Sequence, residues 1–304
     1  MLGGLLRYGG LAWRPGGMPG TYVCRAPGED ALAAEIGQQA WVGSATLCDE
    51  YLTVAARPEA LERVAVEIVR AGPDCLTSDA LRGHTVPAGQ RADLAAAPDW
   101  QTARIALAAE LTASLAAAAG ARLTTLTTLT TPRGSTTGRY ESKGSMAGAV
   151  AYAGADAVRF ALARTRPGRR EPPSPEAIAR HVLGNPAYAV RYAHAAAAAV
   201  LRWAGTQPGD FRPRRLTAPG ELALLDALSW LPERVAVAAR RGRPDEFARY
   251  LETLASRTID IMSTTSYSPS AESVPSERLW LAEAARTGLA AGLGLLGISA
   301  PDRL

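Results

Sequence analysis

Two tyrosines four residues apart carry the chemistry that this sequence presents most clearly. Tyr188 and Tyr192 lie in the segment NPAYAVRYAH, residues 185–194, with Arg191 between them. Side chains at i and i+4 share one face of a helix, so the rings and the guanidinium group would stand together. Aromatic rings of this kind stack on unpaired nucleic-acid bases, at roughly 1–3 kcal/mol per base. The alternative is that both tyrosines are ordinary packing residues of a helical core.

The same segment contains the signals of a helix start. Asn185 can cap a helix, and Pro186 suits the first helical position, where a missing N–H costs nothing. An alanine-rich run follows and would let a neighbouring helix approach closely. His194 lies in this helix, where a histidine is more often a hydrogen-bonded packing residue than a ligand. The pattern predicts a helix over residues 186–204.

Arginine supplies almost all of the positive charge. The 304-residue chain has 33 Lys and Arg against 29 Asp and Glu, a net charge of +4, and Lys143 is its single lysine. Arginines cluster within residues 159–170, 212–215 and 240–243. These clusters could contact phosphate, or they could be the solvated surface of an arginine-biased chain. The charge therefore permits a nucleic-acid partner without pointing to one.

Motifs of other chemistries are missing from the sequence. There is no GxxxxGK[ST] phosphate loop, no GxGxxG after a strand, no HExxH, no EF-hand pattern and no GxSxG elbow. Three histidines and three cysteines without a CxxC pair predict neither a metal site nor a disulfide framework. Arg7 interrupts the apolar start of the chain, and residues 284–298 are too short and broken to span a bilayer. We therefore expect a cytoplasmic protein with no membrane partner and no metal.

Periodicity predicts the elements that position these residues. Before residue 165 we expect a strand at 22–25, a threonine-rich strand at 123–131, and helices at 31–40, 58–71, 99–119 and 147–164. Four prolines and three arginines within residues 165–175 predict a linker at 166–175. After it, helices are expected at 175–184, 186–204, 219–241, 244–262 and 275–296. The expected fold class is mainly α, with an all-α bundle over residues 176–304 and an α/β or α-rich region over residues 1–165.

Three ordered blocks of the predicted bundle carry a recognisable pattern. They are NPAYAVRYAH, then LALLDALSWLPERVAVAARRGRPDEFARYLETLAS at 222–256, and RLWLAEAARTGLAAGLGLLGISAPDRL at 278–304. The first is similar to NPxYYVQYAHAR and the last to a helix ending in LLGxxAPERM, both from the DALR-type anticodon-binding domain of arginyl-tRNA synthetases. By this resemblance the chain is identified as a degenerate, arginyl-tRNA synthetase-related anticodon-binding protein.

The resemblance implies that this bundle receives the anticodon loop of a tRNA or a tRNA-like RNA. Ala189 and Ala196 stand where the family has a tyrosine and an arginine, Arg191 replaces its glutamine, and Leu304 replaces its terminal methionine. The residues expected to bind RNA are Tyr188, Arg191, Tyr192, His194, Arg202, Arg278 and Leu304.

Residues upstream of the bundle resemble the end of the family's class I catalytic domain. GADAVRFALAR, residues 154–164, is similar to the family segment GxDAARFxLL. Ser142-Lys143 lies where the KMSK signature belongs, but Tyr140-Glu141 replaces its Lys-Met, and no HIGH-type motif precedes it. A class I synthetase uses both signatures to stabilise adenylate formation. We therefore expect a degenerate catalytic remnant in which Lys143 is no catalyst.

Three functions follow from these expectations. The leading one is a tRNA-binding protein that does not aminoacylate on its own and needs no cofactor. The second is a divergent arginine–tRNA ligase, which would consume ATP. The third is a helical interaction protein without RNA binding. The first and third differ in whether Tyr188, Arg191 and Tyr192 share an exposed face. The sequence indicates no oligomeric state.

Overall fold

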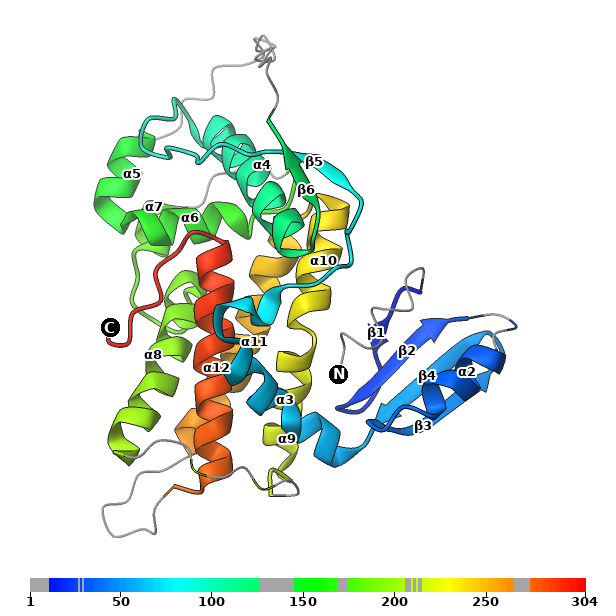
Figure 1. The fold of residues 1–304 in the computed structure, drawn as a ribbon. Coiled ribbons are helices and arrows are strands. Elements are labelled where there is room, and N and C mark those ends of the chain that lie inside the picture. The colour runs from blue at the N-terminus through cyan, green and yellow to red at the C-terminus, as the bar shows by residue number, and fades with distance from the viewer. Residues whose placement is uncertain are drawn as a thin grey trace.

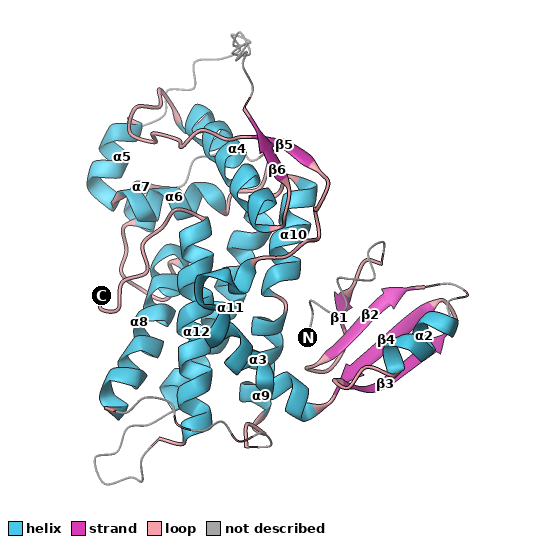
Figure 2. Ribbon diagram, viewed as in Figure 1, coloured by secondary structure: helices cyan, strands magenta, loops and turns pink. Residues whose placement is uncertain are grey.

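A long helical bundle with a small sheet beside it makes up the fold. The computed structural model describes residues 11–26, 28, 30–125, 145–168, 174–205, 209, 212, 215–264 and 274–304. Figures 1 and 2 show the sheet to one side of the long helices, and the C-terminus lying beside helix α8. The mainly α fold class predicted from the sequence is confirmed.

Four antiparallel strands form the sheet, in the order β1-β2-β4-β3. Alternate residues of β2 and β4, among them Tyr22 and Leu52, are buried against Ile36 of α2. The predicted strand at 22–25 and the predicted helix at 31–40 are present, whereas β3 and β4 were not predicted. The bounds are β1 Arg14–Pro15, β2 Thr21–Arg25, α2 Asp30–Gly37, β3 Val42–Cys48 and β4 Tyr51–Ala56.

Helix α3, Pro58–Ala71, leads from the sheet into the bundle and ends where Gly72 has φ +57°, as the Gly-Pro signal predicts. The expected loop after it contains a 3-10 turn, Gly72–Leu76, and strand β5, Thr85–Pro87. β5 pairs in parallel with β6, Arg122–Thr124. Helix α4, Trp100–Ala118, lies between these strands in the chain, capped by Asp99. Of the strand expected at 123–131, residues 126–131 lie outside the described residues.

Three expected helices differ from the observed ones, each for a local reason. The helix expected at 147–164 is two, α5 (Met146–Ala153) and α6 (Ala155–Ala163), because Gly154 at φ +85° breaks it. The helix expected at 219–241 is also two, α9 (Pro219–Ser229) and α10 (Leu231–Arg241), since Pro232 lacks the N–H that would continue the ladder.

The third difference is α7, Pro175–Ile178, which is shorter than the helix expected at 175–184. The Asn185 side chain donates to the carbonyls of Ile178 and Arg180 at 2.9 and 2.6 Å. These bonds satisfy helix-end acceptors and turn the chain into α8. The division of the chain at 166–175 stays a prediction, although one hydrophobic core includes residues on both sides of it, from Leu61 to Ile298.

Helices α8 (Pro186–Ala204), α11 (Pro244–Thr264) and α12 (Ser276–Leu295) pack against one another. Glycines on α12 permit the close approach. A Cβ at Gly292 would lie 2.5 Å from Leu251 Cδ2, and one at Gly288 would lie 2.9 Å from Leu231 Cδ1. The helices can therefore pack this closely only because glycine has no side chain at these two positions.

In the part of the chain that the structure describes, no helix combines the length and the apolar character needed to traverse a bilayer.

Candidate nucleic-acid interface

A groove of about 1110 Å³ runs along α8, bounded on its other sides by α11 and the C-terminal residues. Four of the predicted RNA-binding residues line it: Tyr188, Tyr192, Arg202 and Leu304. Its floor on α8 consists of small side chains, and α11 adds apolar ones. The other lining residues are Ala195, Ala196, Ala199, Val200, Trp203, Ile259, Met262, Ser263, Asp302 and Arg303.

Three aromatic rings stack at one end of this groove. His181 lies on Tyr188 with ring centroids 5.4 Å apart and planes at 12°, and Tyr188 lies on Tyr192 at 5.8 Å and 26°. Four residues of α-helix rise about 6 Å, so the stack runs along the axis of α8. Tyr192 is 37% exposed and ends the stack on the groove side. The predicted tyrosine pair thus shares a face, whereas the part of His181 was not predicted.

Asn185 positions this stack. Its side-chain oxygen accepts from the Ala187 N–H at 3.2 Å and caps α8, as predicted. Its amide group, buried with the rest of the side chain, holds the preceding turn through the carbonyls of Ile178 and Arg180. Because that turn carries His181, one asparagine fixes both the helix start and the ring that covers Tyr188.

The C-terminal tail, residues 296–304, forms one wall of the groove and is tied to α6. Arg159 is buried, donates from Nε to the Leu296 carbonyl at 2.5 Å, and forms an ion pair with Glu110. Asp156 accepts hydrogen bonds from the backbone N–H and the hydroxyl of Ser299. These contacts direct the tail back toward α8.

Two predicted RNA-binding residues of α8 hold this tail and do not line the groove. Arg191 donates from Nη2 to Ser299 Oγ at 3.3 Å and lies 3.9 Å from the Asp156 carboxylate. His194 is 1% exposed, and its Nδ1 lies 3.0 Å from the Pro301 carbonyl oxygen. Burial lowers the pKa of His194, so the neutral ring donates to that carbonyl. The packing interpretation of His194 fits this geometry.

The remaining predicted residues are distributed more widely. Arg202 is exposed and donates from Nη1 to the Asp302 carbonyl at 2.8 Å, which places its guanidinium on the groove rim. Arg278, at the start of α12, donates from Nε to Glu221 of α9 at 2.8 Å and does not line the groove. Lys143 lies outside the described residues. Trp203 and Arg303 line the groove but were not predicted. Trp203 follows Tyr192 by eleven residues, about three turns of α-helix, so this spacing could have placed both on one face.

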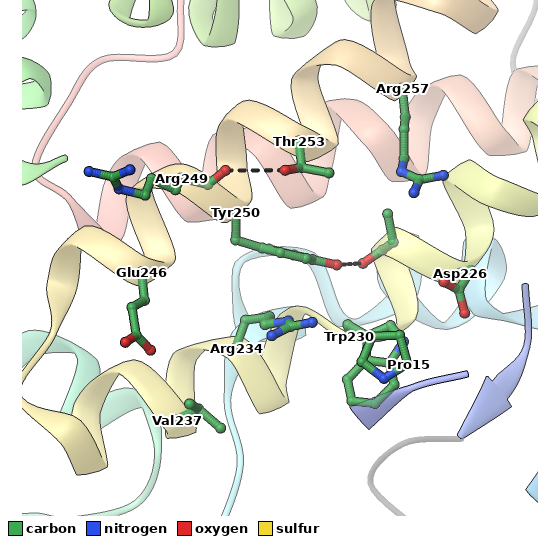
Figure 3. A pocket seen from close by; sticks show the side chains of 11 residues that line it. Pro15, Asp226, Trp230, Arg234, Val237, Glu246, Arg249, Tyr250, Thr253 and Arg257 are labelled. Carbon is green, nitrogen blue, oxygen red and sulfur yellow. Dashed lines mark hydrogen bonds between the residues drawn. The ribbon is translucent and has the colours of Figure 1, made fainter. Parts of the chain in front are cut away.

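A second cavity, of about 320 Å³, lies where the sheet meets α9, α10 and α11 (Figure 3). Arg234 lies beside two aromatic rings there, 5.4 Å from the centroid of Trp230 and 5.1 Å from that of Tyr250. Next to the sheet, the Gly20 N–H donates a hydrogen bond to Oδ1 of Asp226 at 2.9 Å. Because the lining mixes arginines with Asp226 and Glu246, its charges largely compensate one another. The cavity therefore marks the place where the sheet and the bundle meet.

Within the described ranges, no three His, Cys, Asp or Glu side chains come together in a way that could hold a metal ion.

Comparison with known proteins locates a relationship in the C-terminal half. Residues 190–304 match the family model of the DALR anticodon binding domain. The arginine–tRNA ligase of Kineococcus radiotolerans is 39% identical over 163 residues, which are 51% of this chain and 29% of the ligase. The ligase of Clavibacter sepedonicus is 36% identical over 158 residues, or 50% of this chain and 28% of the ligase. The matches thus span less than a third of either ligase.

Among solved structures, a putative arginyl-tRNA synthetase from Campylobacter jejuni is similar with a TM-score of 0.48 and 20% identity, covering 54% of this chain and 37% of that chain.

Proposed function

From the premise that residues 190–304 form a DALR anticodon binding domain related to that of arginine–tRNA ligases, we propose that the chain binds the anticodon loop of a tRNA or a tRNA-like RNA. The observation that carries this proposal is the groove along α8, with stacked rings at one end and arginines on its rim. Unpaired bases of RNA are recognised by stacking on aromatic side chains and by contacts to their edges.

In this proposal, each part of the groove has a distinct role. The exposed face of Tyr192 receives a base, Tyr188 backs it, and Arg202 meets a phosphate from the rim. Leu304 closes the groove from the tail. Arg191 and His194 act through the tail, by holding Ser299 and Pro301 in place.

We also propose that the chain does not aminoacylate on its own and uses no ATP. Support comes from the sequence, which has no HIGH-type motif and an altered KMSK position at Lys143. Arginine-dependent exchange between ATP and pyrophosphate, measured with and without tRNA, should stay at background. Exchange above background would favour the alternative of a divergent arginine–tRNA ligase.

RNA binding itself is tested by anisotropy of a labelled tRNA titrated with the protein. Tyr192→Ala should weaken binding roughly 5- to 150-fold, the equivalent of losing one stacked base. Tyr152→Ala is the matched control, since Tyr152 is 65% exposed on α5 and does not line the groove. Equal affinities of the folded Tyr192→Ala variant and the wild type would contradict the proposal. Absence of binding to any tRNA would favour a helical interaction protein.

A further inference from the structure

We infer that the groove along α8 holds a run of three to four consecutive unpaired bases by stacking, and that it accepts them with little regard to their identity. The inference rests on the proposed function, and it narrows the ligand to a class: single-stranded RNA segments of mixed sequence. It departs from a site built to recognise one anticodon.

A row of aromatic rings along α8 is interrupted within the groove. The stack of His181, Tyr188 and Tyr192 follows the axis of α8. The next residues that α8 contributes to the groove are Ala195, Ala196 and Ala199, which cannot continue it. Trp203 lies about one helical turn beyond Ala199, lines the groove with its indole ring and is 61% exposed. The short alanine side chains therefore leave this part of the groove open between the two aromatic ends.

The distance between Tyr192 and Trp203 along α8 suits a short run of bases. Trp203 follows Tyr192 by eleven positions, which corresponds to about three turns of α-helix and an advance of about 16 Å along its axis. Stacked bases advance by about 3.4 Å each. Three to four bases therefore fit between the two side chains. A fully paired stem would not fit this way, because its bases already stack within a duplex.

The side chains that line the groove offer few means of distinguishing one base from another. Readout of a base edge depends on donors and acceptors held in paired geometry, typically from Asn, Gln or Arg. The described residues that line the groove include no Asn or Gln. Val200, Ile259 and Met262 are apolar, and Ser263 and Asp302 are the short polar side chains of the lining. Arg202 already donates a hydrogen bond to the Asp302 carbonyl, and Arg303 is the other arginine of the described lining. Apolar walls contact any base, since every base has a π face.

The test uses labelled anticodon stem–loops with one common stem. The three central loop positions are changed to each base in turn, and affinity is measured by anisotropy at fixed salt. We expect all loops to bind within about tenfold of one another, purines more tightly than pyrimidines. A single base change that weakens binding by more than tenfold would overturn the inference, because a bidentate base contact discriminates by about 1–3 kcal/mol. Failure of every stem–loop to bind would instead overturn the proposed function.

A second readout reports on the Trp203 end of the groove. Stacking of a base on this indole should quench tryptophan emission on addition of an open-loop RNA, and the paired stem alone should not quench it. Trp203→Phe keeps a ring for packing and should bind while losing most of the quench. An unchanged quench in Trp203→Phe would place the bases elsewhere and contradict the inference. Tyr152→Ala, on α5, should leave both affinity and quench as in the wild type.

Discussion

The Nδ1 atom of His194 lies 3.0 Å from the carbonyl oxygen of Pro301, in a residue that is 1% exposed. The contact joins the middle of α8 to the C-terminal tail. On one side of this contact lies the hydrophobic core, and on the other the tail forms a wall of the groove. A buried histidine thus connects the stability of the bundle with the shape of its proposed binding surface.

We expect His194→Ala to lower the free energy of unfolding by roughly 1–3 kcal/mol, because it leaves the Pro301 carbonyl unpaired and opens a small void. It should also weaken RNA binding, since Asp302, Arg303 and Leu304 lose one of the contacts that hold them against α8. Urea denaturation and anisotropy titration measure the two effects. His84→Ala, at an exposed position, is the control and should change neither. A variant with reduced stability and wild-type RNA affinity would separate the tail from the binding surface.

Stability should fall below neutral pH because of the same residue. Burial is the largest influence and lowers the pKa of His194 from its ordinary value of 6.5; Asp302 and Glu283 favour the charged ring, and Arg286 opposes it. Between the folded-state pKa and 6.5 the unfolded chain binds more protons than the folded one, so the free energy of unfolding decreases as pH falls through this window. Above it, both states are neutral and the effect vanishes.

Denaturation midpoints of the wild type and of His194→Gln, measured from pH 7.5 downward, check this expectation. The glutamine variant keeps a donor for the Pro301 carbonyl but does not titrate. The difference between the two proteins should be constant near pH 7.5 and shrink as the wild type loses stability. A difference that stays constant down to pH 5 would assign the pH dependence to other groups.

Gly292→Ala should destabilise the bundle by about 1–3 kcal/mol, because the new Cβ would lie 2.5 Å from Leu251 Cδ2 and force the helices apart. Gly294→Ala, two residues further along α12, meets nothing within 4 Å and serves as the matched control. It should be neutral or stabilising by up to roughly 1 kcal/mol, since alanine favours helix. Equal behaviour of the two variants in urea denaturation would refute the proposed packing constraint.

RNA binding should depend only moderately on salt. Arg202 and Arg303 are the cations of the described groove lining, and Asp302 offsets part of their charge. If each arginine meets one phosphate, the slope of log K against log salt is about −1.4 for a single strand. Arg202→Ala should reduce its magnitude by about 0.7. A much steeper slope would show that other arginines, such as those within 240–243, also meet the RNA.

Local signals explain which parts of the site were predictable from the sequence. The start of α8 follows from Asn185 and Pro186 alone, and the shared face of Tyr188 and Tyr192 follows from their spacing. The resemblance to arginyl-tRNA synthetases and the DALR-type domain is confirmed for the C-terminal half. Each of these signals lies within a few neighbouring residues or within one continuous block of sequence.

The parts that escaped prediction depend on contacts between distant segments. Arg191 turns away from the groove because Ser299 and Asp156 attract its guanidinium, and neither is near it in the chain. His181 joins the stack because Asn185 holds the turn before α8. Strands β3 and β4 were missed because the exposed face of a small sheet leaves only a weak alternation, as in VGSATLC.

The tail that closes the groove is held to the helices by a few polar contacts. Asp302, Arg303 and Leu304 supply one wall, and α8 and α11 supply the others. The tethers of that wall include the contacts of Leu296 with Arg159, of Ser299 with Asp156 and of Pro301 with His194. Exchanges at these positions could therefore reshape the groove while the helices that line it keep their packing.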